Sequence, residues 1–246
     1  DDIYDVGAEC FRWQFAVAVL GSVAGVNPFN QPDVEASKRA TRRLTDRLSS
    51  GRSVRLRPSV GHWRYETGEV KAYAPGVYGR WLYRNVRNGS TLRNWLQTHL
   101  EQAATGDYVA ILAYLKCDEV FRRKIQQLRM LVRAATRCAT TVGFGPQYLH
   151  ATGQLHKGGP RNVLFLVLTC SDVDDTDAPD DGTKFGDIRA AQARGDEEIL
   201  VERKHRYLRL HLEGDVANAL DEVLNVIGDD VTANGNVVSL NDDAAK

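Results

Sequence analysis

The distribution of hydrophobic residues divides the chain into two regions of different character. In the first region, residues 7–25 are apolar on nearly all sides, which is typical of a helix buried inside a large fold. After a turn, Pro32 suits the first position of a second helix, which we expect to end near Ser49. Residues 1–50 are therefore predicted to be two helices that belong to a larger domain.

The second region alternates short apolar segments with amphipathic ones. Strands that are apolar on both faces are typical of parallel sheets covered by helices, so the pattern predicts an α/β layer domain with a parallel or mixed sheet. The expected strands are residues 108–115, 139–144, 163–169 and 207–212. The expected helices are residues 91–105 with Ser90 as the cap, 119–136, 185–194 and 216–227.

Two further stretches show no lasting period. Residues 51–75 mix Arg, Gly, Ser and Pro with aromatic residues, and we interpret them as a linker with some irregular or strand structure. The polar end, residues 229–246, is predicted to be a flexible tail, and the acidic stretch 172–181 an exposed loop. The expected organisation is therefore a helical segment over 1–50, the linker, an α/β domain over 76–228 and the tail.

Composition narrows the class of function. Lys plus Arg and Asp plus Glu are equal at 32 each, and a net charge of zero argues against a nucleic-acid binder while leaving room for a local phosphate pocket. The longest apolar run, residues 15–26, is too short to span a bilayer. The four cysteines form no CxxC pair, which favours buried thiols in a reducing cytoplasm. We interpret Asp1, which no basic signal region follows, as an entry in mid-domain.

The first candidate site combines Gln31 and Lys38. Seven helical steps of about 100° place the two residues within roughly 20° of each other around the helix axis. Together with the free N–H groups at the helix start, they suit an oxygen-rich or anionic ligand. Lys38 also borders the buried face marked by Val34, where desolvation would lower its pKa and let it transfer protons. A surface lysine on an ordinary helix remains the alternative at this point.

The second candidate site is the polar cluster over residues 141–160, between two predicted strands. His150 and His156 can shuttle protons at neutral pH. The glycine pair lets backbone N–H groups approach an anion, so the segment could cradle a phosphate or sugar. Its cradle residues are His156, Lys157, Gly158 and Gly159. A turn-rich connection is the alternative, and the two histidines lack a third nearby ligand for zinc, so no metal is expected.

The first motif resembles the C-terminal signature of glucose-6-phosphate isomerases, Asn-x-Phe-Asp-Gln-x-x-Val-Glu-x-x-Lys. The matching residues are Asn27, Phe29, Gln31, Val34, Glu35 and Lys38. The resemblance implies that residues 1–50 are the helical end of a sugar-isomerase (SIS-like) domain. It also implies that Gln31 binds substrate and that Lys38 assists ring opening by proton transfer at the ring oxygen. Two positions depart from what the family carries. Asn30 replaces the Asp of this pattern. In the preceding helix, Gln14 replaces an acidic residue that normally follows Arg-Trp in the fusion-type enzymes.

The second motif resembles a carboxy extension of bacterial transaldolase/glucose-6-phosphate isomerase fusions. That extension carries a Leu-His-x-x-Gly-Gln-Leu-His-Lys-Gly-Gly-Pro run, which residues 149–160 match. The segment is also loosely similar to one in ordinary glucose-6-phosphate isomerases whose histidine aids ring opening, and this implies a catalytic role for His150. The resemblance implies no cofactor.

One part of the reaction is missing from the chain. Aldose–ketose isomerisation needs a general base that moves a proton between C1 and C2, which is a Glu in this family. Neither that Glu motif nor the Ser/Thr-rich phosphate loops are found, so we expect them in an upstream sugar-isomerase domain or a second subunit. The expected function is a segment of the enzyme that interconverts glucose 6-phosphate and fructose 6-phosphate, incomplete alone.

Two alternatives come from other classes. A non-catalytic sugar-phosphate-binding or assembly module would need the same ligand contacts without a base. Transaldolase activity would need a barrel with a Schiff-base lysine, and the chain shows no eightfold βα repeat.

Overall fold

The computed structural model describes most of the chain, which divides into two compact units, residues 1–32 and 33–246. The described residues are 2–49, 63–66, 68–86, 91–171, 177, 184–233 and 235. Each unit has its own structure, and the sheet belongs to the second.

The first unit contains the expected apolar helix, α1 (Asp5–Ala24). The helix ends at Gly25, whose φ of 68° lies in the left-handed region that a residue without a Cβ adopts readily. Within this unit the helix does not achieve the expected burial, because three of its aromatic side chains, Phe11, Trp13 and Phe15, are 70%, 69% and 64% exposed. Cys10 is exposed as well, against the expectation of a buried thiol.

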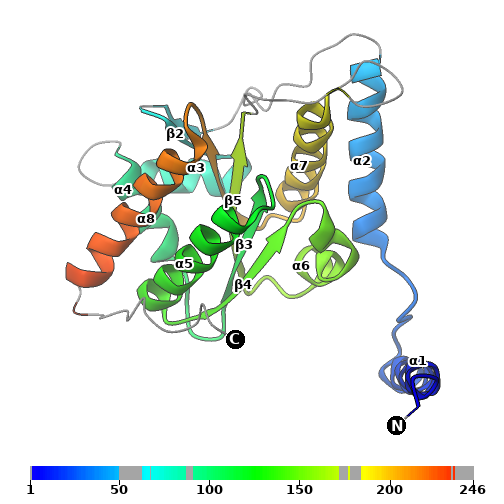
Figure 1. Cartoon of the computed structure of the whole chain (residues 1–246). Helices are drawn as coiled ribbons and strands as arrows, with labels where there is room; N and C mark the ends of the chain where they lie inside the picture. The colour runs from blue at the N-terminus through cyan, green and yellow to red at the C-terminus, as the bar shows by residue number, and fades with distance from the viewer. Residues whose placement is uncertain are drawn as a thin grey trace. The chain divides into compact units, whose positions relative to one another are not determined.

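The second unit is built on a six-stranded mixed sheet (Figure 1) with the order β1-β2-β6-β5-β3-β4. The strands are β1 (Trp63–Tyr65), β2 (Val70–Ala74), β3 (Tyr108–Tyr114), β4 (Ala139–Phe144), β5 (Val163–Cys170) and β6 (Arg206–Leu212). Neighbours from β6 to β4 are parallel, whereas β2 runs antiparallel to both β1 and β6. This confirms the predicted α/β class.

The helices of this unit lie on both faces of the sheet. They are α2 (Pro32–Ser49), α3 (Gly76–Asn85), α4 (Leu92–Leu100), α5 (Glu119–Thr136), η1 (Gln147–His150), α6 (Gly153–Gly158), α7 (Phe185–Glu202) and α8 (Val216–Ala233). One face packs against α4, α5 and α8, whereas η1 and α7 cover the other, with α6 and α2 on that same side (Figure 1).

The strands are apolar on both faces because each face has its own core. In β3, Ile111 contributes to the core beneath α5 and α8, and the next residue, Leu112, to the core beneath α7. β6 differs from β3, since its Arg209 and His211 are buried polar side chains, and His211 Nδ1 lies 2.9 Å from the hydroxyl oxygen of Thr169 in β5. The second face of the sheet is therefore partly polar although it is buried.

Several element boundaries differ from the expected ones. β2 lies within the segment predicted as a linker, yet it pairs with β6 and is part of the sheet. Helix α4 is capped by Thr91, whose Oγ1 accepts a hydrogen bond from the Asn94 N–H at 3.2 Å, rather than by Ser90, which lies outside the described residues. Both α7 and α8 are longer than predicted, and α8 enters the expected tail.

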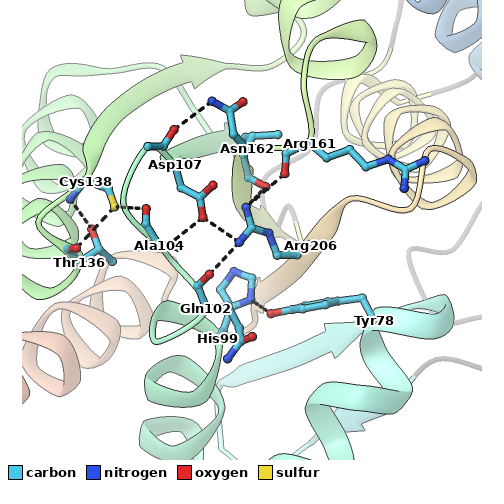
Figure 2. Close-up of polar contacts among 12 residues, drawn as sticks. Tyr78, His99, Gln102, Ala104, Asp107, Thr136, Cys138, Arg161, Asn162 and Arg206 are labelled. Carbon is cyan, nitrogen blue, oxygen red and sulfur yellow. Dashed lines mark hydrogen bonds and ion pairs between the residues drawn. The ribbon is translucent and has the colours of Figure 1, made fainter.

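A hydrogen-bonded cluster lies at the amino ends of the parallel strands (Figure 2). Arg206 Nη1 donates to the Gln102 carbonyl at 2.7 Å and to Asp107 Oδ2 at 2.8 Å. The Arg206 guanidinium holds the pKa of the Asp107 carboxyl below its usual range. The cluster ties the loop after α4 to β6, which is a structural role.

Candidate functional site

Lys38 lies on an exposed side of α2. Its Nζ is 2.7 Å from Glu35 Oε1, one helical turn away, and its side chain is 51% exposed. The hydrogen bond from Lys38 lowers the pKa of Glu35. The expected half-buried position is therefore not found, because Glu35 holds the ammonium in a solvated ion pair. Gln31, the other member of the first motif, belongs to the first unit and is exposed.

The opposite side of α2 is bound tightly to α6. The Asp33 N–H donates to Gln154 Oε1 at 3.0 Å, and Gln154 Nε2 donates back to Asp33 Oδ2 at 2.8 Å. Arg203, at the end of α7, makes an ion pair with the other Asp33 oxygen. This carboxylate at the first turn of α2 thus contacts both neighbouring helices, which fixes where the helix begins.

Lys157 stands at the centre of a buried polar cluster. Its Nζ donates to Ser37 Oγ at 2.7 Å and to Asp196 Oδ1 at 2.6 Å, and its side chain is 0% exposed. Asp196 also accepts hydrogen bonds from the hydroxyls of Tyr114 and Tyr148. Burial lowers the pKa of Lys157 and raises the pKa of both tyrosines. Lys157 therefore joins α6, α7 and α2, and it differs from the expected substrate contact because protein atoms surround its ammonium.

The two histidines of the second motif have different environments. His156 is buried, with Nδ1 3.0 Å from the Tyr108 hydroxyl, and burial lowers its pKa to about 4. Its imidazole is therefore neutral at pH 7. His150, at the end of η1, is exposed. Of the two, His150 is the one that a substrate in solvent can reach.

The glycine pair serves close packing. A Cβ on Gly158 would lie 2.4 Å from Asp33 Oδ2 and 2.5 Å from Gln154 Nε2, and a Cβ on Gly159 would lie 2.3 Å from the Leu155 carbonyl oxygen. A side chain at Gly158 would push α6 away from α2, and one at Gly159 would collide with the backbone of α6 itself. The expected phosphate cradle is thus replaced by a helix contact, since the space beside Gly158 is filled by Asp33.

The structure brings the two motifs together in a way the sequence does not reveal. Ser37 and Asp33 of the first motif contact Lys157 and Gln154 of the second. Asp196 was not among the predicted site residues, because the helix that carries it was expected to end at 194. Its only signal in the sequence was a run of three acidic residues, Asp196 to Glu198, followed directly by apolar ones.

A second buried group lies beside this cluster. Glu197 accepts hydrogen bonds from Arg209 Nε at 2.9 Å and from the Tyr207 hydroxyl at 3.1 Å, and it also pairs with Arg194. The Arg209 guanidinium lies 4.7 Å from the centre of the Tyr73 ring, within the range of a cation–π contact. The adjacent carboxylates of α7, Asp196 and Glu197, are thus each paired with a cation inside the fold.

These features define an α/β protein with a mixed sheet and a polar buried cluster beneath three helices. No family model and no curated protein matches the chain. A solved structure of a hypothetical protein from Thermus thermophilus is similar, with 16% identity and a TM-score of 0.45. The match covers 68% of this chain, which spans 45% of the length of that protein.

Two kinds of feature are absent from the described residues. None of their helices is long and apolar enough to cross a membrane. Nor do these residues include a group of three or more His, Cys, Asp or Glu side chains that could hold a metal ion.

Proposed function

We propose that the chain is the C-terminal part of a cytoplasmic glucose-6-phosphate isomerase of the transaldolase-fusion type. In this proposal it supplies substrate-orienting and ring-opening groups for the interconversion of glucose 6-phosphate and fructose 6-phosphate in glycolysis and gluconeogenesis. The observation that carries the proposal is the contact between the two motifs, since residues 120 and 121 positions apart in the chain bond to each other. A motif helix held in this way presents a cation at a fixed place.

Lys38 is the group that we assign to ring opening. Its helix is fixed through Asp33 and Ser37, while the ammonium itself is solvent-exposed and paired only with the exposed side chain of Glu35 among the described residues. A sugar phosphate can therefore bind the Lys38 ammonium in place of Glu35 without breaking a buried contact. We assign substrate binding to Gln31, and a supporting role in ring opening to His150.

The proposal requires a general base from outside this chain. Proton transfer between C1 and C2 needs a carboxylate placed against the substrate carbons, and a group of this kind contributes about 10²–10⁴ in rate. The buried carboxylates Asp196 and Glu197 cannot serve, because each is engaged by a cation and a hydroxyl inside the fold. We therefore place the base in a preceding sugar-isomerase domain.

Helix α1 favours such a partner. Its aromatic and aliphatic side chains are exposed on several sides, which a helix in its final environment rarely shows. A sugar-isomerase domain or a second subunit that packs around α1 would bury them. The same surface fits the alternative function, a non-catalytic binding or assembly module, which differs in having no turnover with any partner.

A coupled isomerase assay tests the proposal. The chain alone should convert fructose 6-phosphate very slowly, and a separately purified sugar-isomerase domain added in trans should restore turnover. In the restored enzyme, Lys38→Met should lower kcat by about 10²-fold, because a proton-transfer group is lost. Lys116→Met, at an exposed lysine that also pairs with a carboxylate, is the matched control.

The outcomes separate the two functions. Rapid turnover by the chain alone would contradict the proposal that the general base lies outside this chain. An unchanged kcat in Lys38→Met would remove Lys38 from the mechanism. Binding of the added domain without any turnover would favour the assembly module.

A further inference from the structure

A groove of about 490 Å³ lies between α2 and α7. Its lining combines three arginines, two carboxylates and two apolar residues. These residues are Ala36, Arg39, Arg42, Arg43, Asp46, Ile199 and Glu202. Such a combination differs from an ordinary charged helix surface, because the buried side chain of Ile199 lies among the charged groups that line it.

The groove follows from how closely the two helices approach. A Cβ on Gly195 would lie 2.5 Å from Thr41 Oγ1 and 2.9 Å from the Thr41 backbone nitrogen, so the α7 backbone touches α2 directly. Ile199 and Glu202 follow Gly195 by four and seven residues and lie on the same side of α7. They therefore face the groove beside the contact point.

The basic side of the groove has free hydrogen-bonding capacity. Arg39, Arg42 and Arg43 are all exposed. Among the described residues, Arg43 forms a long ion pair with Glu198 at 3.5 Å, and no ion pair or hydrogen bond engages the guanidinium of Arg39 or Arg42. A guanidinium presents a planar fork of N–H donors that matches phosphate oxygens.

We propose that this groove binds a phosphate ester of a small polyhydroxylated compound. The phosphate would lie against Arg39 and Arg42, and the carbon chain against Ile199. Asp46 and Glu202 would accept hydrogen bonds from the hydroxyls. The carboxylates repel a bare anion, so the groove favours an ester with hydroxyl donors over inorganic phosphate.

The groove adjoins the site assigned to ring opening, although Lys38 is not part of its lining. Lys38 precedes Arg42 by four residues, a separation of roughly 40° around the helix axis, so the two side chains lie on neighbouring parts of α2. Glu35, the ion-pair partner of Lys38, also interacts electrostatically with Arg39 and Arg42. The inference stands on the groove residues alone and does not depend on the isomerase proposal.

Titrations followed by NMR test the proposal with ribose 5-phosphate, inorganic phosphate and ribose. These probes are not substrates of a hexose-phosphate isomerase. With the full chain, ribose 5-phosphate should shift the side-chain N–H signals of Arg39 and Arg42 and bind at least tenfold more tightly than inorganic phosphate. Ribose should not bind. The double variant Arg39→Gln/Arg42→Gln should weaken binding of ribose 5-phosphate at least tenfold.

Matched variants separate the parts of the site. Arg80→Gln, at an exposed arginine of α3, should bind ribose 5-phosphate as the unmodified chain does. Asp46→Asn/Glu202→Gln should bind inorganic phosphate more tightly and lose the preference for the ester. Equal shifts at Arg80 and at the groove arginines would overturn the proposal, as would unchanged binding in the Arg39→Gln/Arg42→Gln variant.

Discussion

The contacts of Lys157 show how one side chain can hold a helix in place. Its ammonium connects Ser37 of α2 with Asp196 of α7, and the ion pair is shielded from water. Lys157→Met would leave Asp196 buried without its cation. Loss of one partner of a buried pair costs about 3–5 kcal/mol, so we expect the free energy of unfolding to fall by that amount in urea titrations.

A second variant tests that reason. Lys157→Met/Asp196→Leu removes both charges, and it should recover part of the lost stability although Tyr114 and Tyr148 lose their acceptor. Lys116→Met, at an exposed lysine, should change the midpoint little. If the double variant were less stable than Lys157→Met, packing rather than charge would explain the loss.

Buried histidines give the fold a dependence on pH. Burial lowers the pKa of His99 to about 3 and of His211 to about 4, as it does for His156. At these three histidines the unfolded chain binds protons below about pH 6.5, whereas the folded chain binds them only at about pH 4 or lower. Stability should thus be complete above about pH 6.5 and decline as the pH falls toward 4.

Thermal melts between pH 7.5 and 4.5 measure this decline. His99→Phe removes one of the contributing groups, so its melting temperature should fall less steeply with pH, although it is lower at pH 7.5 because the hydrogen bond with Tyr78 is lost. A melting temperature that rises as the pH is lowered would contradict the assignment of neutral buried imidazoles.

At the scale of elements, the contact between α2 and α7 depends on one residue without a side chain. Ala has a higher helix propensity than Gly by about 1 kcal/mol, yet Gly195→Ala should destabilise the protein because its Cβ would meet the Thr41 backbone. Amide hydrogen exchange should then accelerate in α2. Gly228→Ala, in α8, is the control, since its Cβ would find only Leu131 at 4.0 Å, and that variant should be neutral or stabilising.

The elements also show what the sequence could predict. Helix 119–136 and strand 139–144 match the structure, because Asp118 caps the helix and its apolar residues recur at helical spacing. The end of α7 was missed because Asp196 is polar in sequence but neutralised by a partner 39 residues away. The location of Lys38 on a helix was likewise predictable. Its exposure was not, since that depends on which side of α2 packs on α6.

At the scale of the whole molecule, the chain has an apolar helix, α1, that its own unit does not cover. Because α1 exposes Phe11, Trp13 and Phe15, we expect the purified chain to self-associate as its concentration rises. Sedimentation velocity should show this, and Trp13→Glu/Phe15→Glu should shift the protein toward monomer. Val120→Glu, at a single exposed apolar residue of α5, should have no effect. A protein that remains monomeric at every concentration would show that α1 does not drive self-association.

The bonds between α2 and α6 join residues 120 and 121 positions apart, and this separation governs the order of folding. Contacts that close so long a loop form late, after neighbouring strands and helices have assembled. We therefore expect α2 to dock last on a nearly complete sheet and to open first when the protein fluctuates. During synthesis α2 would emerge from the ribosome before α6 and α7 and would remain undocked until both of those helices have emerged.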